Sequence, residues 1–258
     1  MFKATDFMYD GIYSAKYGLK IASFDNESLD NTEYVTPQIA VSKPGKSKKF
    51  YYLDTTYESP PKYEFSIVGE SAIPQEILRE VLNWLDARVG FKPLIIMQPG
   101  VDDLTYSCIF TVTNLIYHAG SCVGLRLTAT FDSNYILGKP TKVQITGTGA
   151  QQEVMLYNKS DNIDFYVYPK VTFKTTDGNV SVKNLTDDPS REFIFKDLNR
   201  NVEYTVDNEL KIIMGEGQNL LGKFNKNWLR VLRGKNRLSV KINGTMTITC
   251  PRQLKISF

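Results

Sequence analysis

The chain has 258 residues, of which 42% are hydrophobic and 23% charged, with a formal net charge of +3. This composition is typical of globular proteins and excludes collagen-like, low-complexity and largely disordered chains. No apolar run approaches the roughly 18–20 residues that a membrane-spanning helix requires. The start of the chain carries Asp6 and Asp10 and lacks the apolar core of a signal peptide. We therefore expect a soluble protein that folds in a reducing cytoplasm.

The sequence offers few residues for catalysis or metal binding. Its single histidine, His118, cannot supply the two or three imidazoles of common zinc sites, and it ends an apolar strand before a glycine turn. The three cysteines, Cys108, Cys122 and Cys250, lie among apolar neighbours. We expect them to be free, buried thiols, because they are too few and too scattered for a disulfide framework or a metal knuckle.

Catalytic and nucleotide-binding motifs are also missing. The sequence contains no G-x-S-x-G turn, no GxxxxGK[ST] phosphate loop and no strand-linked GxGxxG. The acid pairs Asp102-Asp103 and Asp187-Asp188 could serve carboxylate chemistry, but adjacent residues of a strand point to opposite faces. Gly100 precedes the first pair and Pro189 follows the second, as is typical of turns. We expect no enzymatic activity, no cofactor and no metal.

One segment, from Ile73 to about Val89, has the periodicity of a helix. Ser71 is placed to cap it, Pro74 suits its first turn, and Gly90 follows its end. Apolar residues recur at helical spacing along it, namely Ile77, Leu78, Val81, Leu82 and Leu85. The pattern predicts an amphipathic helix that packs against a sheet.

Strand patterns dominate the rest of the chain. Apolar and polar residues alternate in Tyr63–Val68, Tyr106–Leu115 and Val123–Phe131. Further along, alternating segments flank Asp177-Gly178 and Asn243-Gly244, which are strong signals for type I′ hairpins. We predict a mainly β protein with one helix.

A domain boundary is expected near Gly138-Lys139-Pro140, where the helical signal ends and short strands begin to repeat. We predict a mixed β domain with one helix over residues 1–138 and a β-sandwich over residues 139–258. The charge divides in the same way. The first part has 12 basic and 16 acidic residues, a net charge of −4, and the second has 19 and 12, a net charge of +7. No acidic residue follows Glu216.

Several segments, in the same order along the chain, resemble the distal tail proteins of long-tailed siphophages, which form the hub of the tail-tip baseplate. They are Gly11–Leu19, the helix that follows Tyr63–Val68, the strands Tyr106–Leu115 and Gly124–Phe131, the corner Asp132–Tyr135, and the late strand and turn Phe224–Asn236. The resemblance covers nearly the whole chain.

The resemblance implies a homohexameric ring in the virion tail tip, made in the cytoplasm of the host bacterium. Amino-terminal domains would surround a central channel for DNA, and a galectin-like β-sandwich would face outward. The ring would join the tail tube protein to a tail-associated lysin or fibre hub protein, and receptor-binding proteins are further possible partners. Neither sequence-specific nucleic-acid binding nor membrane insertion is expected.

Two sets of interface residues follow from this expectation. Strand edges in the first domain could pair between subunits, and the ends of the candidate strands are Tyr63, Val68, Tyr106 and Leu115. Basic residues of the second domain could contact acidic partners, and the candidates are Lys223, Lys226, Arg230, Arg233 and Lys235. Six amino-terminal domains would give the channel side a charge of about −24, which repels DNA phosphates.

Three alternatives remain open at this stage. A carbohydrate-binding sandwich for host attachment could use Trp228 or Tyr166–Tyr168 to stack on a sugar. Phe224 and Trp228 among basic residues could bind a phosphate backbone. A cell-wall hydrolase would need two carboxylates about 5–10 Å apart, and the sequence nominates no such pair.

Overall fold

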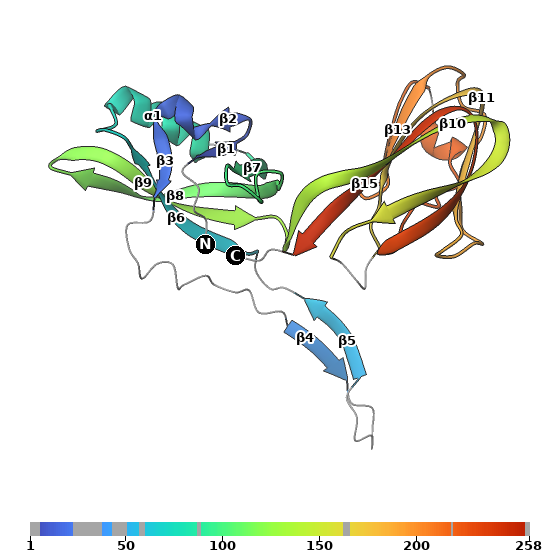
Figure 1. The fold of residues 1–258 in the computed structure, drawn as a ribbon, viewed down its shortest axis with the longest axis horizontal. Coiled ribbons are helices and arrows are strands. Elements are labelled where there is room, and N and C mark those ends of the chain that lie inside the picture. The colour runs from blue at the N-terminus through green and yellow to red at the C-terminus, as the bar shows by residue number, and fades with distance from the viewer. Residues whose placement is uncertain are drawn as a thin grey trace. The chain divides into compact units, whose positions relative to one another are not determined.

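The computed structural model describes residues 6–22, 38–42, 51–56, 60–86, 89–161, 166–217 and 219–255. These residues form two compact units, which divide the chain between Ile136 and Leu137 (Figure 1). Both units consist mainly of β-strands, and the described part of the chain contains one α-helix. The predicted fold class, mainly β with one helix, is confirmed.

The first unit is built on a seven-stranded antiparallel sheet. In spatial order its strands are β2 (Ile12–Tyr13), β1 (Phe7–Tyr9), β7 (Lys92–Ile96), β8 (Tyr106–His118), β9 (Ser121–Phe131), β6 (Lys62–Gly69) and β3 (Leu19–Ala22). A short 3₁₀ helix, η1 (Ser14–Tyr17), precedes β3, and a separate two-stranded sheet contains β4 (Gln38–Ser42) and β5 (Tyr51–Thr56).

Helix α1 (Gln75–Leu85) packs against this sheet, as predicted, but it begins later and ends earlier than its periodicity suggests. Pro74 occupies the N-cap position without a side-chain hydrogen bond, so Ser71 does not cap the helix. Trp84, which the predicted apolar stripe omits, is buried and stacks on Phe7 with ring centroids 5.7 Å apart. Its Nε1 donates a hydrogen bond to the carbonyl of Tyr9 at 2.9 Å, which fixes the helix to β1.

The second unit contains a six-stranded sheet and a short 3₁₀ helix, η2 (Leu220–Lys223). Its strands are β10 (Tyr135–Asn158), β11 (Lys170–Asn184), β12 (Glu192–Phe195), β13 (Glu203–Asp207), β14 (Ile212–Met214) and β15 (Gly234–Lys255). The spatial order is β10-β15-β11-β13-β14, and β12 also pairs with β11. The segment 138–140, where the sequence predicts a boundary, lies inside β10.

The two predicted hairpins are wrong. Asp177-Gly178 lies within β11 and Asn243-Gly244 within β15, and these long strands pair with each other on both sides of the two dipeptides. The register shifts between Thr175 and Val180, so residues 176–179 form a bulge. Asp177 Oδ1 closes the bulge by accepting hydrogen bonds from the Thr175 hydroxyl at 2.8 Å and the Asn179 N–H at 3.0 Å.

Each of the three long strands bends, and each carries a glycine with positive φ: Gly149 in β10 (89°), Gly178 in β11 (84°) and Gly244 in β15 (141°). Figure 1 shows β10 and β15 rising along one side of the unit, turning over and returning along the other. A Cβ atom at Gly244 would overlap the carbonyl oxygen of Lys174, and one at Gly178 would lie 2.7 Å from the carbonyl oxygen of Leu198. Glycine is therefore required where the strands approach other backbone closely.

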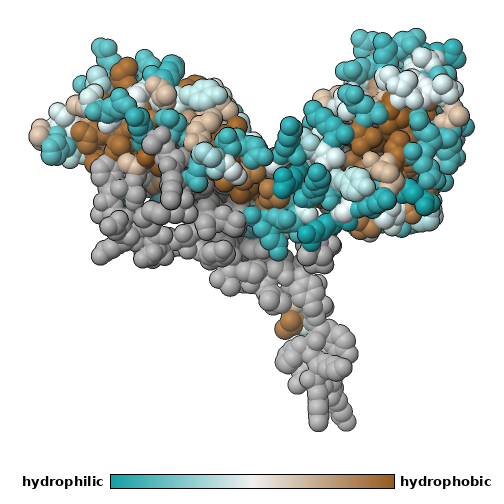
Figure 2. Space-filling view, viewed as in Figure 1, coloured by the Kyte–Doolittle hydropathy of each residue, from teal (hydrophilic) through white to brown (hydrophobic). Residues whose placement is uncertain are grey.

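The bend lets a single sheet enclose the core of the second unit. Phe173 lies before the bulge in β11. Strand β12 pairs with β11 beyond the bulge, and its residue Phe195 packs against Phe173 with ring centroids 5.6 Å apart. Phe224 stacks on Phe195 with ring centroids 4.6 Å apart. The segment that precedes β15 therefore packs into the same core. In Figure 2, apolar side chains are visible between polar ones on both units.

The bend gives a prediction about stability. Gly244→Ala should lower the free energy of unfolding of the second unit by about 1–3 kcal/mol more than Gly234→Ala does, because its methyl group would overlap Lys174. Gly234 is a suitable control, since its φ of 87° carries the cost of a left-handed residue but its Cβ would meet open space. Differential scanning calorimetry of the two variants and the parent chain tests this. Equal losses of stability for both variants would contradict the prediction.

Candidate functional site

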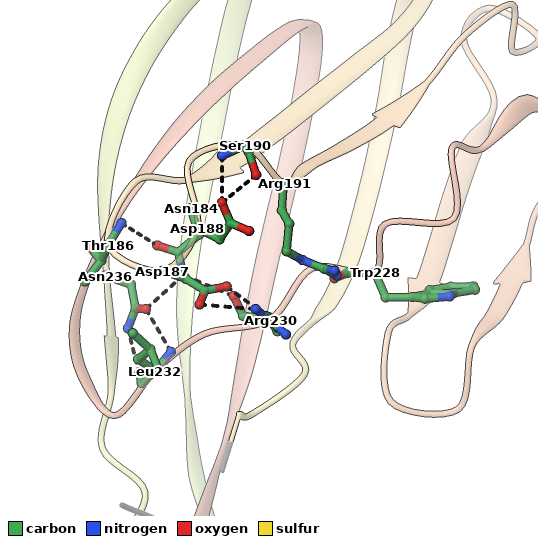
Figure 3. Close-up of polar contacts among 10 residues, drawn as sticks. All are labelled: Asn184, Thr186, Asp187, Asp188, Ser190, Arg191, Trp228, Arg230, Leu232 and Asn236. Carbon is green, nitrogen blue, oxygen red and sulfur yellow. Dashed lines mark hydrogen bonds and ion pairs between the residues drawn. The ribbon is translucent and has the colours of Figure 1, made fainter. Parts of the chain in front are cut away.

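Arg230 lies in a polar cluster of the second unit (Figure 3). Its Nε donates a hydrogen bond to Asp187 Oδ2 at 2.8 Å, and its guanidinium carbon lies 3.7 Å from the centre of the Tyr166 ring. The side chains of Arg230 and Asp187 are only 22% and 9% exposed. The hydrogen bond to Asp187 raises the pKa of Arg230 above its usual value. Arg230 is thus engaged within the fold, which argues against its expected role as a partner contact.

Two buried asparagines fix the backbone around this ion pair. Asn184 donates through Nδ2 to the carbonyl of Arg230 at 3.1 Å and to Asn236 Oδ1 at 3.0 Å. Asn236 accepts from the N–H of Leu232 and donates to its carbonyl, at 2.9 and 2.7 Å. The segment Phe224–Asn236, part of the family resemblance, therefore determines the shape of a turn.

The acid pair next to this cluster has the turn role that the sequence predicts. Asp188 accepts hydrogen bonds from the hydroxyl and the N–H of Ser190, at 2.6 and 2.9 Å. These bonds lower the pKa of Asp188 below its usual value, the hydroxyl bond having the larger effect. Asp187 and Asp188 thus have different partners and do not share a site for carboxylate chemistry.

Trp228 is not presented for stacking on a sugar beside these polar groups. Its indole points away from Arg191 and Arg230 (Figure 3) and meets the ring of Phe224 edge-on, with centroids 4.8 Å apart. Only its backbone carbonyl faces the cluster, where it accepts a hydrogen bond from Arg191 at 3.4 Å. The hollow here has a volume of about 10 Å³, which is room for one water molecule.

Most of the other predicted basic residues lie on the surface. Lys226, Arg233 and Lys235 are exposed, and Lys223 is half-buried at the end of η2. Lys235 lines a larger hollow together with Met155, Leu185, Thr186 and Arg237. Sequence reasoning missed this hollow, because its residues come from three separate segments of the chain.

The interface strands predicted in the first unit are not edge strands. β6 pairs with β9 and β3, and β8 pairs with β7 and β9, so both lie inside the sheet. Alternation of apolar and polar residues predicts that a segment forms a strand, but it does not reveal the neighbours of that strand. Strand β8 lies inside the sheet because β7 pairs with it, and β6 because β3 pairs with it. The four predicted residues have these partners: Tyr63 pairs with Ala129, Val68 with Lys20 and Gly124, Tyr106 with Leu94, and Leu115 with Leu125.

The second half of β8 nevertheless has an open side. β7 pairs with β8 only over Tyr106–Cys108, whereas β8 continues to His118 with β9 as its described partner. Asp86, at the end of α1, accepts a hydrogen bond from the N–H of Val112 at 3.1 Å and so covers the edge there. Beyond this point, Tyr117 is 60% exposed. His118 is exposed at the end of the strand, next to a turn.

The cysteines occupy apolar positions. Cys108, Cys122 and Cys250 are free and buried, and burial raises the pKa of Cys108 and of Cys250 to about 12. Among the described residues, no group of three or more His, Cys, Asp or Glu side chains could hold a metal ion. No helix in the described part of the chain is long and apolar enough to cross a membrane.

The ion pair gives a second prediction. Asp187→Asn should reduce the free energy of unfolding of the second unit by about 1–3 kcal/mol, because it removes the charged partner of a mostly buried guanidinium. Glu153→Gln is the matched control, because Glu153 pairs with Arg237 on the surface. This substitution should lower the free energy of unfolding by about 1 kcal/mol or less. Urea unfolding curves of both variants test this, and equal effects would contradict a structural role for the Arg230–Asp187 pair.

Comparisons with known proteins agree with the fold. The model of the family described as "Phage tail protein N-terminal domain" matches residues 2–133, and that of "Phage tail C-terminal domain" matches residues 135–250. No curated protein matches the sequence. The crystal structure of the Dit protein (gp 19.1) of phage SPP1, described as a paradigm of the hub adsorption apparatus in phages that infect Gram-positive bacteria, is similar in fold. It has a TM-score of 0.67 and 14% identity, over 97% of this chain and 99% of that one.

The family models together cover nearly the whole sequence, and their division at residues 133–135 lies close to the division between the two compact units. The chain therefore belongs to the family of phage tail proteins.

Proposed function

We propose that this chain is a distal tail protein, which forms a homohexameric ring in the tail tip of a siphophage. The ring joins the tail tube protein to a tail-associated lysin or fibre hub protein, carries receptor-binding proteins in some assemblies, and leaves a central channel for DNA. The observation that carries this proposal is the similarity to the SPP1 Dit fold over almost the full length of both chains. A likeness confined to one unit would support only a shared module.

The chemistry of the described residues supports a scaffold rather than an enzyme. The one histidine is exposed at a strand end, and the most prominent polar cluster fixes a turn of the second unit. A structural protein needs complementary surfaces rather than activated side chains. We therefore propose that the surfaces of the two units, rather than a catalytic pocket, perform the function.

The open edge of β8 is our proposed contact between subunits. A closed ring of head-to-tail subunits needs two different surfaces that fit each other. The segment Thr113–His118 offers one, because its outer side has no strand partner among the described residues. The edge strand β3 at the end of the same sheet offers the other. Backbone hydrogen bonds between such edges would extend the sheet around the ring.

The charges of the two units suit the proposed arrangement. The first part of the chain, with a net charge of −4, would surround the channel, where acidic side chains repel DNA phosphates. The second part, with a net charge of +7, would form a galectin-like outer layer. A basic outer layer favours acidic partner proteins.

The assembly gives a third prediction, which light scattering after size-exclusion chromatography tests. Six copies of the 29.3 kDa chain would give a particle of about 176 kDa. Tyr117→Lys should shift this mass towards the monomer, because a charge on an exposed edge disfavours strand pairing between subunits. Tyr157→Lys, at a tyrosine of the second unit that is 47% exposed, should leave the mass unchanged.

A particle that remains monomeric at every concentration would contradict a ring that assembles by itself. If both variants disrupt the ring equally, or if neither does, the contact between subunits does not involve the edge of β8.

A further inference from the structure

A hollow of the second unit is lined by both apolar and basic side chains. It is lined by Met155 of β10, Leu185 and Thr186 after β11, and Lys235 and Arg237 of β15. Its volume is about 320 Å³, which is within the range of sites that bind small ligands or single peptide side chains.

The positions of these residues are determined by the sheet. Lys235 and Arg237 lie two residues apart on one strand and therefore face the same side. Leu185 is held next to them, because its N–H donates to the carbonyl of Arg237 at 2.8 Å. The N–H of Arg237 in turn donates to the Thr186 hydroxyl at 2.9 Å. These two hydrogen bonds hold the turn after β11 against β15 and so fix the shape of the hollow.

The charge of the hollow is only partly neutralised. Arg237 pairs with Glu153 at 3.3 Å, with both side chains more than half exposed. Lys235 is exposed and has no ion-pair partner among the described residues. Met155 and Leu185, here called the apolar floor, are half-buried and contribute apolar surface to the lining.

We propose that this hollow binds an acidic peptide segment of a partner protein, with an apolar side chain on Met155 and Leu185 and a carboxylate on Lys235. The inference rests on the proposed function in one respect, since a tail hub has partner proteins to hold. Charge complementarity selects an acidic segment. The apolar floor favours a peptide over a phosphate polymer, because a hydrated phosphate chain has no apolar group to place against methyl and thioether groups.

Fluorescence anisotropy with the full-length protein tests the proposal. The probes are a fluorescein-labelled peptide of three Asp-Asp-Leu repeats, the same peptide with serine in place of leucine, and labelled polyphosphate. We expect the leucine peptide to bind most tightly. Equal binding of the serine peptide or of polyphosphate would overturn the proposal, because it would show attraction to anions alone, and so would the absence of binding.

Matched variants locate the site. Lys235→Glu should weaken binding of the leucine peptide about tenfold, since it replaces a charge-assisted contact with a repulsive one. Lys241→Glu is the control, because Lys241 is exposed on the same strand opposite Ser181 and does not line the hollow; it should change binding less than about twofold. Equal effects of the two variants would overturn the assignment.

Met155→Gln tests the floor without changing charge. It should weaken binding of the leucine peptide about threefold and leave binding of the serine peptide unchanged, because only the leucine peptide makes apolar contacts.

The mass of the assembly, measured on the same samples, separates this inference from the proposed function. Peptide binding by a monomeric protein would support the hollow and contradict the ring, whereas a ring that binds no peptide would do the reverse.

Discussion

The second unit depends on a bend that three long strands share. A sheet with one apolar face must cover that face, and here β10, β11 and β15 do so by turning over, so that both halves of the same sheet contribute to one core. The turn is possible because Gly178 and Gly244 allow close approach of backbone to backbone. Without the bend, Phe173 and Phe195 could not pack against each other.

The first unit covers its sheet differently, and this difference determines which surfaces remain available. Helix α1 shields one face, and Trp84 fixes it to β1 through stacking and a hydrogen bond. The helix ends at the point where Asp86 covers the edge of β8, which leaves the strand beyond Val112 open. In the second unit the apolar faces turn inward, so the outer faces carry the charges.

The limits of sequence reasoning have physical causes. The helix and the main strands were predictable, because their periodicity is a local property. The predicted hairpins fail because a type I′ turn needs positive φ at both central residues. In the Asp-Gly and Asn-Gly dipeptides of the structure only Gly178 and Gly244 have positive φ, which a bent strand also requires. Whether the flanking segments pair with each other or with a distant strand is a long-range property. Arg230 shows the same limit, since its charge is evident from the sequence but its partner Asp187 lies 43 residues away.

The central claim is that the first units form a ring around a channel. Cryo-electron microscopy of the purified protein at concentrations that favour assembly tests it most directly. We predict sixfold rings with a central opening, with the first units around the opening, β8 and β3 of neighbouring copies in contact, and the second units outside. Single copies without rings, or rings in which the second units surround the opening, would contradict the account.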